Sequence, residues 1–216
     1  MPLDTCGAGR QHGHTHMAMH GLQQLVDRLD ALDPASIDSE SVRTLIAEAS
    51  IPDSDLAPFI TPREDKYARM AVHRSRWFDM MVLTWMPGQV TPIHNHAGSL
   101  GWMRLVRGRM LEERFHLVPS TAAVGLDLAP DVAEPRRGIE LVADERNTLT
   151  QVGSVATVDK HHAIHRISNP REHVRDDVAV TLHVYSKPHD VCLTFDPVAR
   201  CCARRELRFD NPASAR

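Results

Sequence analysis

The chain has 216 residues, which is enough for one domain with a sizeable hydrophobic core. Its formal net charge of -3 gives no overall positive field that would attract nucleic acid. No apolar run approaches the roughly 18 residues that a membrane span needs, and the first residues lack the apolar segment of a secretory signal. We therefore expect a cytoplasmic protein that binds neither nucleic acid nor a membrane.

The cysteines and histidines are distributed unevenly. Cys6, Cys192, Cys201 and Cys202 show no CxxC spacing, which favours reduced thiols over a disulfide framework. Several of the 14 histidines lie in residues 1–20, a polar stretch without apolar periodicity that we expect to be a disordered tail. The histidines expected at the protein surface are His161, His162, His173 and His189.

Residues 21–60 predict short helices. Apolar residues recur at helical spacing in Gly21–Leu32 and again in Ser39–Ala49, and a proline follows each segment. One more short helix is expected within Asp53–Ile60. We expect these helices to flank a larger domain that comprises residues 61–210.

From Lys66 the pattern changes to short apolar strands separated by turn residues. Many short strands at regular spacing predict an all-β sandwich or barrel. Residues 121–137 contain proline, alanine and aspartate and are expected to form a long surface loop. The expected strands include Tyr67–Val72, Asp79–Trp85, Leu100–Val106, Arg109–Leu117, Thr148–Val152, Ser154–Val158, Ala163–Ser168, Val178–Tyr185 and Val191–Phe195.

Two histidines separated by one residue form the centre of a candidate metal site. His94 and His96 lie on a predicted strand after the Pro87-Gly88 turn. Because side chains alternate along a strand with period two, both imidazoles are expected on the same face. Together they can bind one metal ion, with His165 as the third ligand. Three imidazoles suit Fe(II), and also Zn, Ni, Cu or Mn.

This pattern resembles the two metal motifs of the cupin superfamily. The first motif has a glycine, a His-x-His pair, usually a glutamate, and a second glycine; here Gly101 stands where the glutamate would be. The second has a glycine, a histidine and an asparagine. The resemblance implies a single cupin β-barrel (a double-stranded β-helix) with short N-terminal helices. The matching residues are Gly88, His94, His96, Gly108, Gly153, His165 and Asn169.

Within the cupins, the chain is similar to the cysteine dioxygenase type I family of thiol dioxygenases over roughly residues 60 to 200. In that family a Tyr-x-Arg motif binds the substrate carboxylate, and a Ser-His-Tyr triad faces the metal. A cysteine lies near the mouth of the pocket. The matching residues are Tyr67 and Arg69 in the first motif, Thr181, His183 and Tyr185 in the triad, and Cys192 at the mouth.

The resemblance implies a non-haem Fe(II) enzyme that oxidises L-cysteine with O2 to cysteine sulfinate (3-sulfinoalanine). His94, His96 and His165 would hold the iron. Arg69 would grip the substrate carboxylate through two parallel N–H bonds, a contact of about 1.5–3 kcal/mol. Tyr185, oriented by His183, would donate a hydrogen bond to bound oxygen. Tyr67, Thr181 and Cys192 would complete the substrate pocket.

The chain departs from the family pattern at two positions. In the animal enzymes the position of Gly101 is a cysteine that cross-links to the tyrosine equivalent to Tyr185. Since Gly101 has no thiol, we expect a free Tyr185, as in bacterial relatives. The family's Ser-Pro-Pro is Ser186-Lys187-Pro188 here, which changes a loop that shapes the substrate pocket.

Other functions are consistent with the same residues. The same chemistry on 3-mercaptopropionate is one alternative, although relatives that prefer it are expected to lack the arginine at the position of Arg69. Mercaptosuccinate is another, and its second carboxylate would need a further cation such as Arg166, Lys187 or Arg74. A non-catalytic metal-binding sensor and a zinc or nickel isomerase or hydrolase are more distant alternatives. The sequence does not indicate an oligomeric state.

Overall fold

A computed structural model describes residues 21–126, 132, 134–158, 164–171 and 177–211. The predicted tail of residues 1–20 lies outside the described residues, as do His161, His162 and His173. Among the described helices, none combines the length and the apolar character needed to cross a bilayer.

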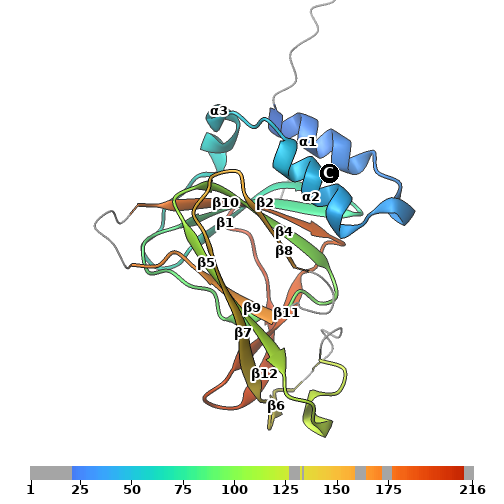
Figure 1. Cartoon of the computed structure of the whole chain (residues 1–216), viewed down its shortest axis with the longest axis vertical. Helices are drawn as coiled ribbons and strands as arrows, with labels where there is room; N and C mark the ends of the chain where they lie inside the picture. The colour runs from blue at the N-terminus through green and yellow to red at the C-terminus, as the bar shows by residue number, and fades with distance from the viewer. Residues whose placement is uncertain (1–20, 127–131, 133, 159–163, 172–176, 212–216) are drawn as a thin grey trace, which may run out of the picture.

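Two antiparallel sheets form the body of the protein (Figure 1). This arrangement confirms the predicted all-β cupin barrel. The first sheet has the order β1 (Ala68–Arg74), β2 (Phe78–Trp85), β10 (Ala179–Ser186), β4 (Leu100–Arg107) and β8 (Val155–Val158). The second has the order β6 (Arg136–Arg137), β12 (Cys201–Glu206), β11 (Val191–Asp196), β3 (Ile93–His94), β9 (Ile164–Ser168), β5 (Met110–Leu117) and β7 (Leu141–Leu149).

The N-terminal helices cover the outer face of the first sheet (Figure 1). They are α1 (Gly21–Asp30), α2 (Ser39–Glu48) and the short α3 (Asp53–Leu56), with 3₁₀ turns η1 (Pro34–Ser36) and η2 (Ala57–Phe59). Because the helices bury one face and the barrel interior buries the other, β2 and β10 are buried at every position. This explains why most residues of β2 are apolar, whereas β10 alternates apolar residues that face the helices with Thr181, His183 and Tyr185 on its inner face.

Leucines of α1 and Ile46 of α2 pack against Val82 of β2 and Leu182 of β10. Each such side chain contributes about 1.5–3 kcal/mol when it is fully buried. Arg104 of β4 donates hydrogen bonds to the carbonyls of Ile46 and Ala49, at 2.7 and 2.6 Å. Those carbonyls at the end of α2 have no partner within the helix, so Arg104 ties the helix to the sheet.

The structure corrects three of the expected elements. The strand expected at Thr148–Val152 is wrong, because β7 ends at Leu149 and a turn follows before β8. No strand was expected at Cys201–Glu206, yet β12 lies there and pairs with β11. Residues 121–137 were expected to form a surface loop, but they include the 3₁₀ turn η3 (Thr121–Ala123). Leu126 in this segment is buried and belongs to the same apolar cluster as Ile93 of the second sheet.

Candidate active site

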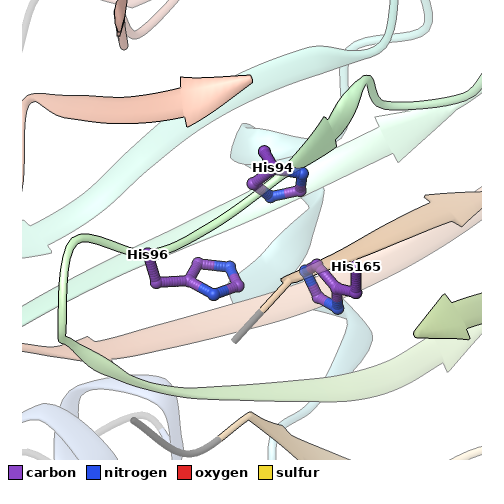
Figure 2. A group of neighbouring side chains, drawn as sticks. All are labelled: His94, His96 and His165. Carbon is purple, nitrogen blue, oxygen red and sulfur yellow. The ribbon is translucent and has the colours of Figure 1, made fainter. Parts of the chain in front are cut away.

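Three histidines from two neighbouring strands form the candidate metal site. His94 ends β3 and pairs directly with His165 of β9, and His96 follows in the same segment. The ligand atoms that the three side chains offer all lie within 4.8 Å of one another. Figure 2 shows the rings of His94, His96 and His165 grouped around a common space. The structure thus brings together the three residues that the sequence proposes as ligands.

Neighbouring oxygen atoms orient two of these rings. His94 Nδ1 donates a hydrogen bond to the Pro92 carbonyl at 3.0 Å, and His165 Nδ1 donates one to Oε1 of Glu112 at 2.8 Å. Each bond leaves the Nε2 atom of its ring for a metal. His165 Nε2 and both ring nitrogens of His96 are buried without a hydrogen-bond partner among the described residues. A bound divalent cation would satisfy such convergent nitrogens, so the donor set fits a metal ion such as Fe(II).

The environment keeps two of the imidazoles neutral. Burial lowers the pKa of His94 and of His96 well below its ordinary value, and the neighbouring His165 lowers each further. A neutral imidazole has a free lone pair, which is the form that binds a metal. The site can therefore accept a cation near pH 7 without first releasing protons from these two residues.

Asn95 fixes the backbone between His94 and His96. Its side chain accepts a hydrogen bond from the Leu193 amide at 2.9 Å and donates one to the Leu126 carbonyl at 3.0 Å. The Asn95 amide in turn donates to the Leu193 carbonyl at 3.1 Å. This fully buried residue therefore locks the metal-site segment to β11 and to the segment around Leu126.

A chain of hydrogen bonds runs along the inner face of β10 and ends at Tyr185. Trp85 Nε1 donates to Thr181 Oγ1 at 2.9 Å, and Thr181 Oγ1 lies 2.9 Å from His183 Nε2. His183 Nδ1 lies 3.1 Å from the Tyr185 hydroxyl. These four residues, Trp85, Thr181, His183 and Tyr185, are called the relay below.

The donor at the start of the relay sets its direction. Indole nitrogen can only donate, so the Thr181 oxygen accepts from Trp85. The Thr181 hydroxyl then donates to His183 Nε2, its remaining hydrogen-bond partner in the described structure. Burial lowers the pKa of His183 to about 3, so the ring is neutral and its proton is on Nδ1. His183 Nδ1 therefore donates to the Tyr185 oxygen, which leaves the phenol proton free for another acceptor.

Tyr185 is itself buried and keeps its proton. Burial raises the pKa of this phenol above its ordinary value of 10.0. Its ring stacks against His96, with ring centroids 5.3 Å apart. A Cβ atom added at Gly101 would lie 3.0 Å from Tyr185 Cε1, so the glycine lies directly against the phenol ring and offers no side chain to bond to it.

A small cavity beside the metal site collects most of the remaining predicted residues. It is lined by Tyr67, Arg69, His94, His183, Tyr185 and Cys192, among others. Tyr67 stacks on Trp85 with ring centroids 4.5 Å apart. Arg69 Nε is buried without a hydrogen-bond partner, and no carboxylate of the described residues forms an ion pair with this side chain. Thr181 does not line the cavity, because it lies behind His183.

Sequence reasoning missed Glu112 and misplaced His189. Glu112 is 1% exposed and contacts His165 through the hydrogen bond that orients that ring. His189 was expected at the surface, but its ring meets the edge of Tyr185 at a centroid distance of 5.1 Å and lies 6.1 Å from that of His96. Burial lowers the pKa of His189 to about 4. The predicted surface position is therefore wrong, because His189 is half-buried and its ring lies against Tyr185.

Asp79 has a buried carboxyl next to the site, and the ionisation of this carboxyl destabilises the folded protein. It is 2% exposed, pairs across the sheet with Tyr185, and its Oδ1 has no hydrogen-bond partner among the described residues. Burial raises the pKa of Asp79 to about 6, although Arg74 and Arg69 oppose this rise. Folding thus disfavours the charged form. This destabilisation is absent below about pH 4, grows as the pH rises towards 6, and reaches its full size above the folded-state pKa of about 6.

Replacing Asp79 by asparagine is therefore expected to stabilise the protein at high pH. The shift from 3.8 to about 6 corresponds to a gain of about 1–3 kcal/mol in the free energy of unfolding at pH 8. Urea unfolding of the wild type and Asp79→Asn at pH 8 and pH 4.5 would measure it. The gain should shrink markedly at the lower pH, and an equal gain at both values would contradict this assignment.

Comparison with known proteins agrees with this geometry. A model of the family described as cysteine dioxygenase type I matches residues 15–198. The cysteine dioxygenase type 1 of Danio rerio is 26% identical over 162 residues, which cover 74% of this chain and 71% of that protein. The Homo sapiens protein is 24% identical over 176 residues, covering 81% and 77%. The match to the Rattus norvegicus protein, 27% identical over 132 residues, spans 61% of this chain and only 56% of that protein.

Solved structures with a similar arrangement are more distant. A protein from Thermus thermophilus has a TM-score of 0.40 and 17% identity, and covers 61% of this chain and 93% of its own. A cupin superfamily protein from Desulfitobacterium hafniense has a TM-score of 0.39 and 15% identity, covering 62% and 89%.

Proposed function

Because the chain belongs to the cysteine dioxygenase type I family, we propose that it is an iron-dependent thiol dioxygenase that oxidises L-cysteine with O2 to cysteine sulfinate. The observation that carries this proposal is the meeting of three unlike groups at one cavity, whose wall includes His94, Arg69 and Tyr185. These groups are the histidine trio, the guanidinium of Arg69 and the phenol of Tyr185. A passive metal-binding module needs neither of the last two.

His94, His96 and His165 would hold the ion. Bound Fe(II) would supply a site for the substrate thiolate and for the activation of O2. The overall reaction adds both oxygen atoms of O2 to the sulfur of the thiol. Sulfur loses four electrons and O2 gains them, so the thiol becomes a sulfinic acid without an external reductant.

The chain's own residues position the substrate. Arg69 has a buried, unpartnered Nε that can donate to a carboxylate, and a second N–H of the planar guanidinium can donate in parallel. Such a bidentate contact fixes the orientation of the substrate and so positions its sulfur relative to the metal site, which is the orienting part of catalysis. Tyr67 forms an aromatic wall beside it and Cys192 a buried thiol at the other side of the cavity.

The relay holds the proton of Tyr185 towards the cavity. Since His183 donates to the phenol oxygen, the phenol proton is available to an oxygen atom next to the metal site. We propose that Tyr185 donates this hydrogen bond during the reaction, that His183 orients Tyr185, and that Thr181 orients His183. Thr181 thus acts through His183 and not by touching the substrate.

Replacing Thr181 by valine tests this order of the relay. Valine keeps the shape but leaves His183 Nε2 without a donor, and the loss of one buried hydrogen bond of about 1.4 kcal/mol corresponds to about a tenfold fall in kcat. Because Thr181 does not line the cavity, KM should change little. Thr181→Ser retains the hydroxyl and is expected to recover most of the rate. An unchanged kcat in Thr181→Val, or a change confined to KM, would contradict the relay.

The activity itself is tested by O2 uptake. Protein is loaded with Fe(II) without oxygen, mixed with L-cysteine, and supplied with O2. We expect one O2 consumed per thiol and a product heavier than cysteine by two oxygen atoms. Protein loaded with zinc is the control. If metal binds but neither L-cysteine nor another small thiol acid drives O2 uptake, the dioxygenase function is wrong and a metal-binding sensor replaces it.

A further inference from the structure

A second arginine lines the same cavity as Arg69. Arg205, on β12, contributes to the wall together with Arg69, Tyr185 and Cys192. The two arginines come from different sheets, since Arg69 lies on β1 of the first sheet and Arg205 near the end of β12 in the second. They therefore approach the cavity from different walls.

The pairing of β11 with β12 determines the position of Arg205. In that register Arg205 lies directly opposite Cys192, whose buried thiol lines the cavity. Residues directly opposite on paired strands share a face of the sheet. Arg205 is therefore on the cavity side of β12, whereas its neighbour Arg204 is on the other side, opposite Leu193.

Arg205 is exposed, and among the described residues it has no carboxylate partner. Arg204 and Arg208 both form ion pairs with Glu206, at 3.8 and 3.1 Å. Within the described part of the chain, no aspartate or glutamate forms an ion pair with Arg205 or with Arg69. An arginine that lines a cavity without an internal partner is suited to bind an anion there.

The cations considered from sequence do not occupy this position. Arg166 pairs with Glu113 at 2.7 Å and Arg74 pairs with Asp190 at 2.7 Å. Lys187 is exposed on the loop after β10. None of the three contributes to the wall of the cavity.

We propose that Arg205 binds a second acidic group of the substrate, so that the site also oxidises thiols with two carboxylates, of which mercaptosuccinate is the representative. This inference rests on the proposed dioxygenase function. Arg69 would bind one carboxylate and Arg205 the other, with the sulfur beside the histidine trio. The balance is that of any thiol: both oxygen atoms of O2 form bonds to sulfur, which is oxidised by four electrons, and no bond to carbon breaks.

The test compares two substrates that differ by one carboxylate. Mercaptosuccinate is 3-mercaptopropionate with a carboxylate added to the carbon that bears sulfur. We expect the wild type to show a kcat/KM for mercaptosuccinate at least tenfold above that for 3-mercaptopropionate, as one charge-assisted pair contributes about 1.5–3 kcal/mol. In Arg205→Met this ratio should fall at least tenfold, and in Arg205→Lys it should fall less.

Arg204→Met is the matched control, because Arg204 is the adjacent residue on the opposite face of β12. Its ratio should equal that of the wild type. If Arg205→Met lowers kcat/KM equally for both thiols, Arg205 serves the shared carboxylate or the fold, and the inference is overturned. An unchanged ratio overturns it as well.

A binding measurement separates this inference from the proposed function. Succinate and propionate carry the same acids without a thiol, and calorimetry of the purified protein needs no turnover. We expect succinate to bind at least tenfold more tightly than propionate, and Arg205→Met to remove that difference. If no thiol drives O2 uptake but succinate binding still depends on Arg205, the dioxygenase function fails and the anion site stands. If succinate binds to Arg205→Met as to the wild type, the anion site fails.

Discussion

Replacing Glu112 by alanine is expected to weaken metal binding by about 10- to 100-fold, the usual cost of removing the group that orients a metal-ligating histidine. Glu112 Oε1 accepts from His165 Nδ1 at 2.8 Å, while its Oε2 lies 3.2 Å from Arg114. Burial alone would raise the pKa of Glu112, but the hydrogen bond from His165 and the neighbouring Arg114 outweigh it, so the pKa lies below its ordinary value. The carboxylate is therefore ionised and holds the Nε2 atom of His165 in place.

Competition with a chromophoric chelator measures this affinity for the metal alone. Glu112→Gln keeps an acceptor of the same shape and should lose less, which also guards against a variant that fails to fold. Glu113→Gln is the matched control, because Glu113 is the next residue on β5, is only half-buried and pairs with Arg166. Wild-type metal affinity in a folded Glu112→Ala would show that His165 needs no orienting group.

Replacing Arg69 by methionine is expected to lower kcat/KM for L-cysteine by about 10- to 150-fold. This range follows from the loss of a charge-assisted contact of about 1.5–3 kcal/mol to the substrate carboxylate. Arg69→Lys should lose most of the same activity, because an ammonium group cannot form two parallel bonds. Steady-state O2 uptake gives both numbers.

A thiol without a carboxylate separates recognition from damage to the site. For 2-aminoethanethiol, which has no acid for Arg69 to bind, wild type and Arg69→Met should differ by no more than about threefold. Arg208→Met is a suitable control, since this exposed arginine pairs with Glu206 and does not line the cavity. An equal loss on both substrates would mean that Arg69 supports the structure of the site and does not recognise the carboxylate.

The residues of the site that could be predicted from sequence are those set by strand periodicity. His94 and His96 are separated by one residue, as are Thr181, His183 and Tyr185, so alternation predicts each group on one face, although β3 ends at His94 and does not include His96. The structure then makes the second group a continuous chain of hydrogen bonds. What alternation could not show is that Trp85, from the neighbouring strand, provides the donor that sets the direction of that chain.

Residues that depend on strand register could not be predicted in the same way. Arg205 reaches the cavity only because β12 pairs with β11 in the register that puts it opposite Cys192. The sequence Cys201–Glu206 is too polar to indicate a buried side of a strand. Glu112 lies two residues after the buried Met110 on the same strand, but its contact with His165 depends on the pairing of β5 with β9.

The same limit explains the missed β7. Most of Leu141–Leu149 is exposed, with no alternation of apolar and polar residues. It is a strand because β5 pairs with it along its length. Strand formation at such a sequence depends on the neighbouring strand more than on intrinsic preference.

The place of β3 in the second sheet would link the supply of the bound metal to the stability of the fold. This strand is two residues long and lies between β11 on one side and β9 on the other. His94 of β3 and His165 of β9 would bind one ion, which would join these two strands. Because a ligand that binds only the native state adds RT ln(1 + [L]/Kd) to its stability, a metal ion at a hundredfold excess over Kd would add about 2.7 kcal/mol. The lifetime of the protein against unfolding and proteolysis would then follow the metal available to it.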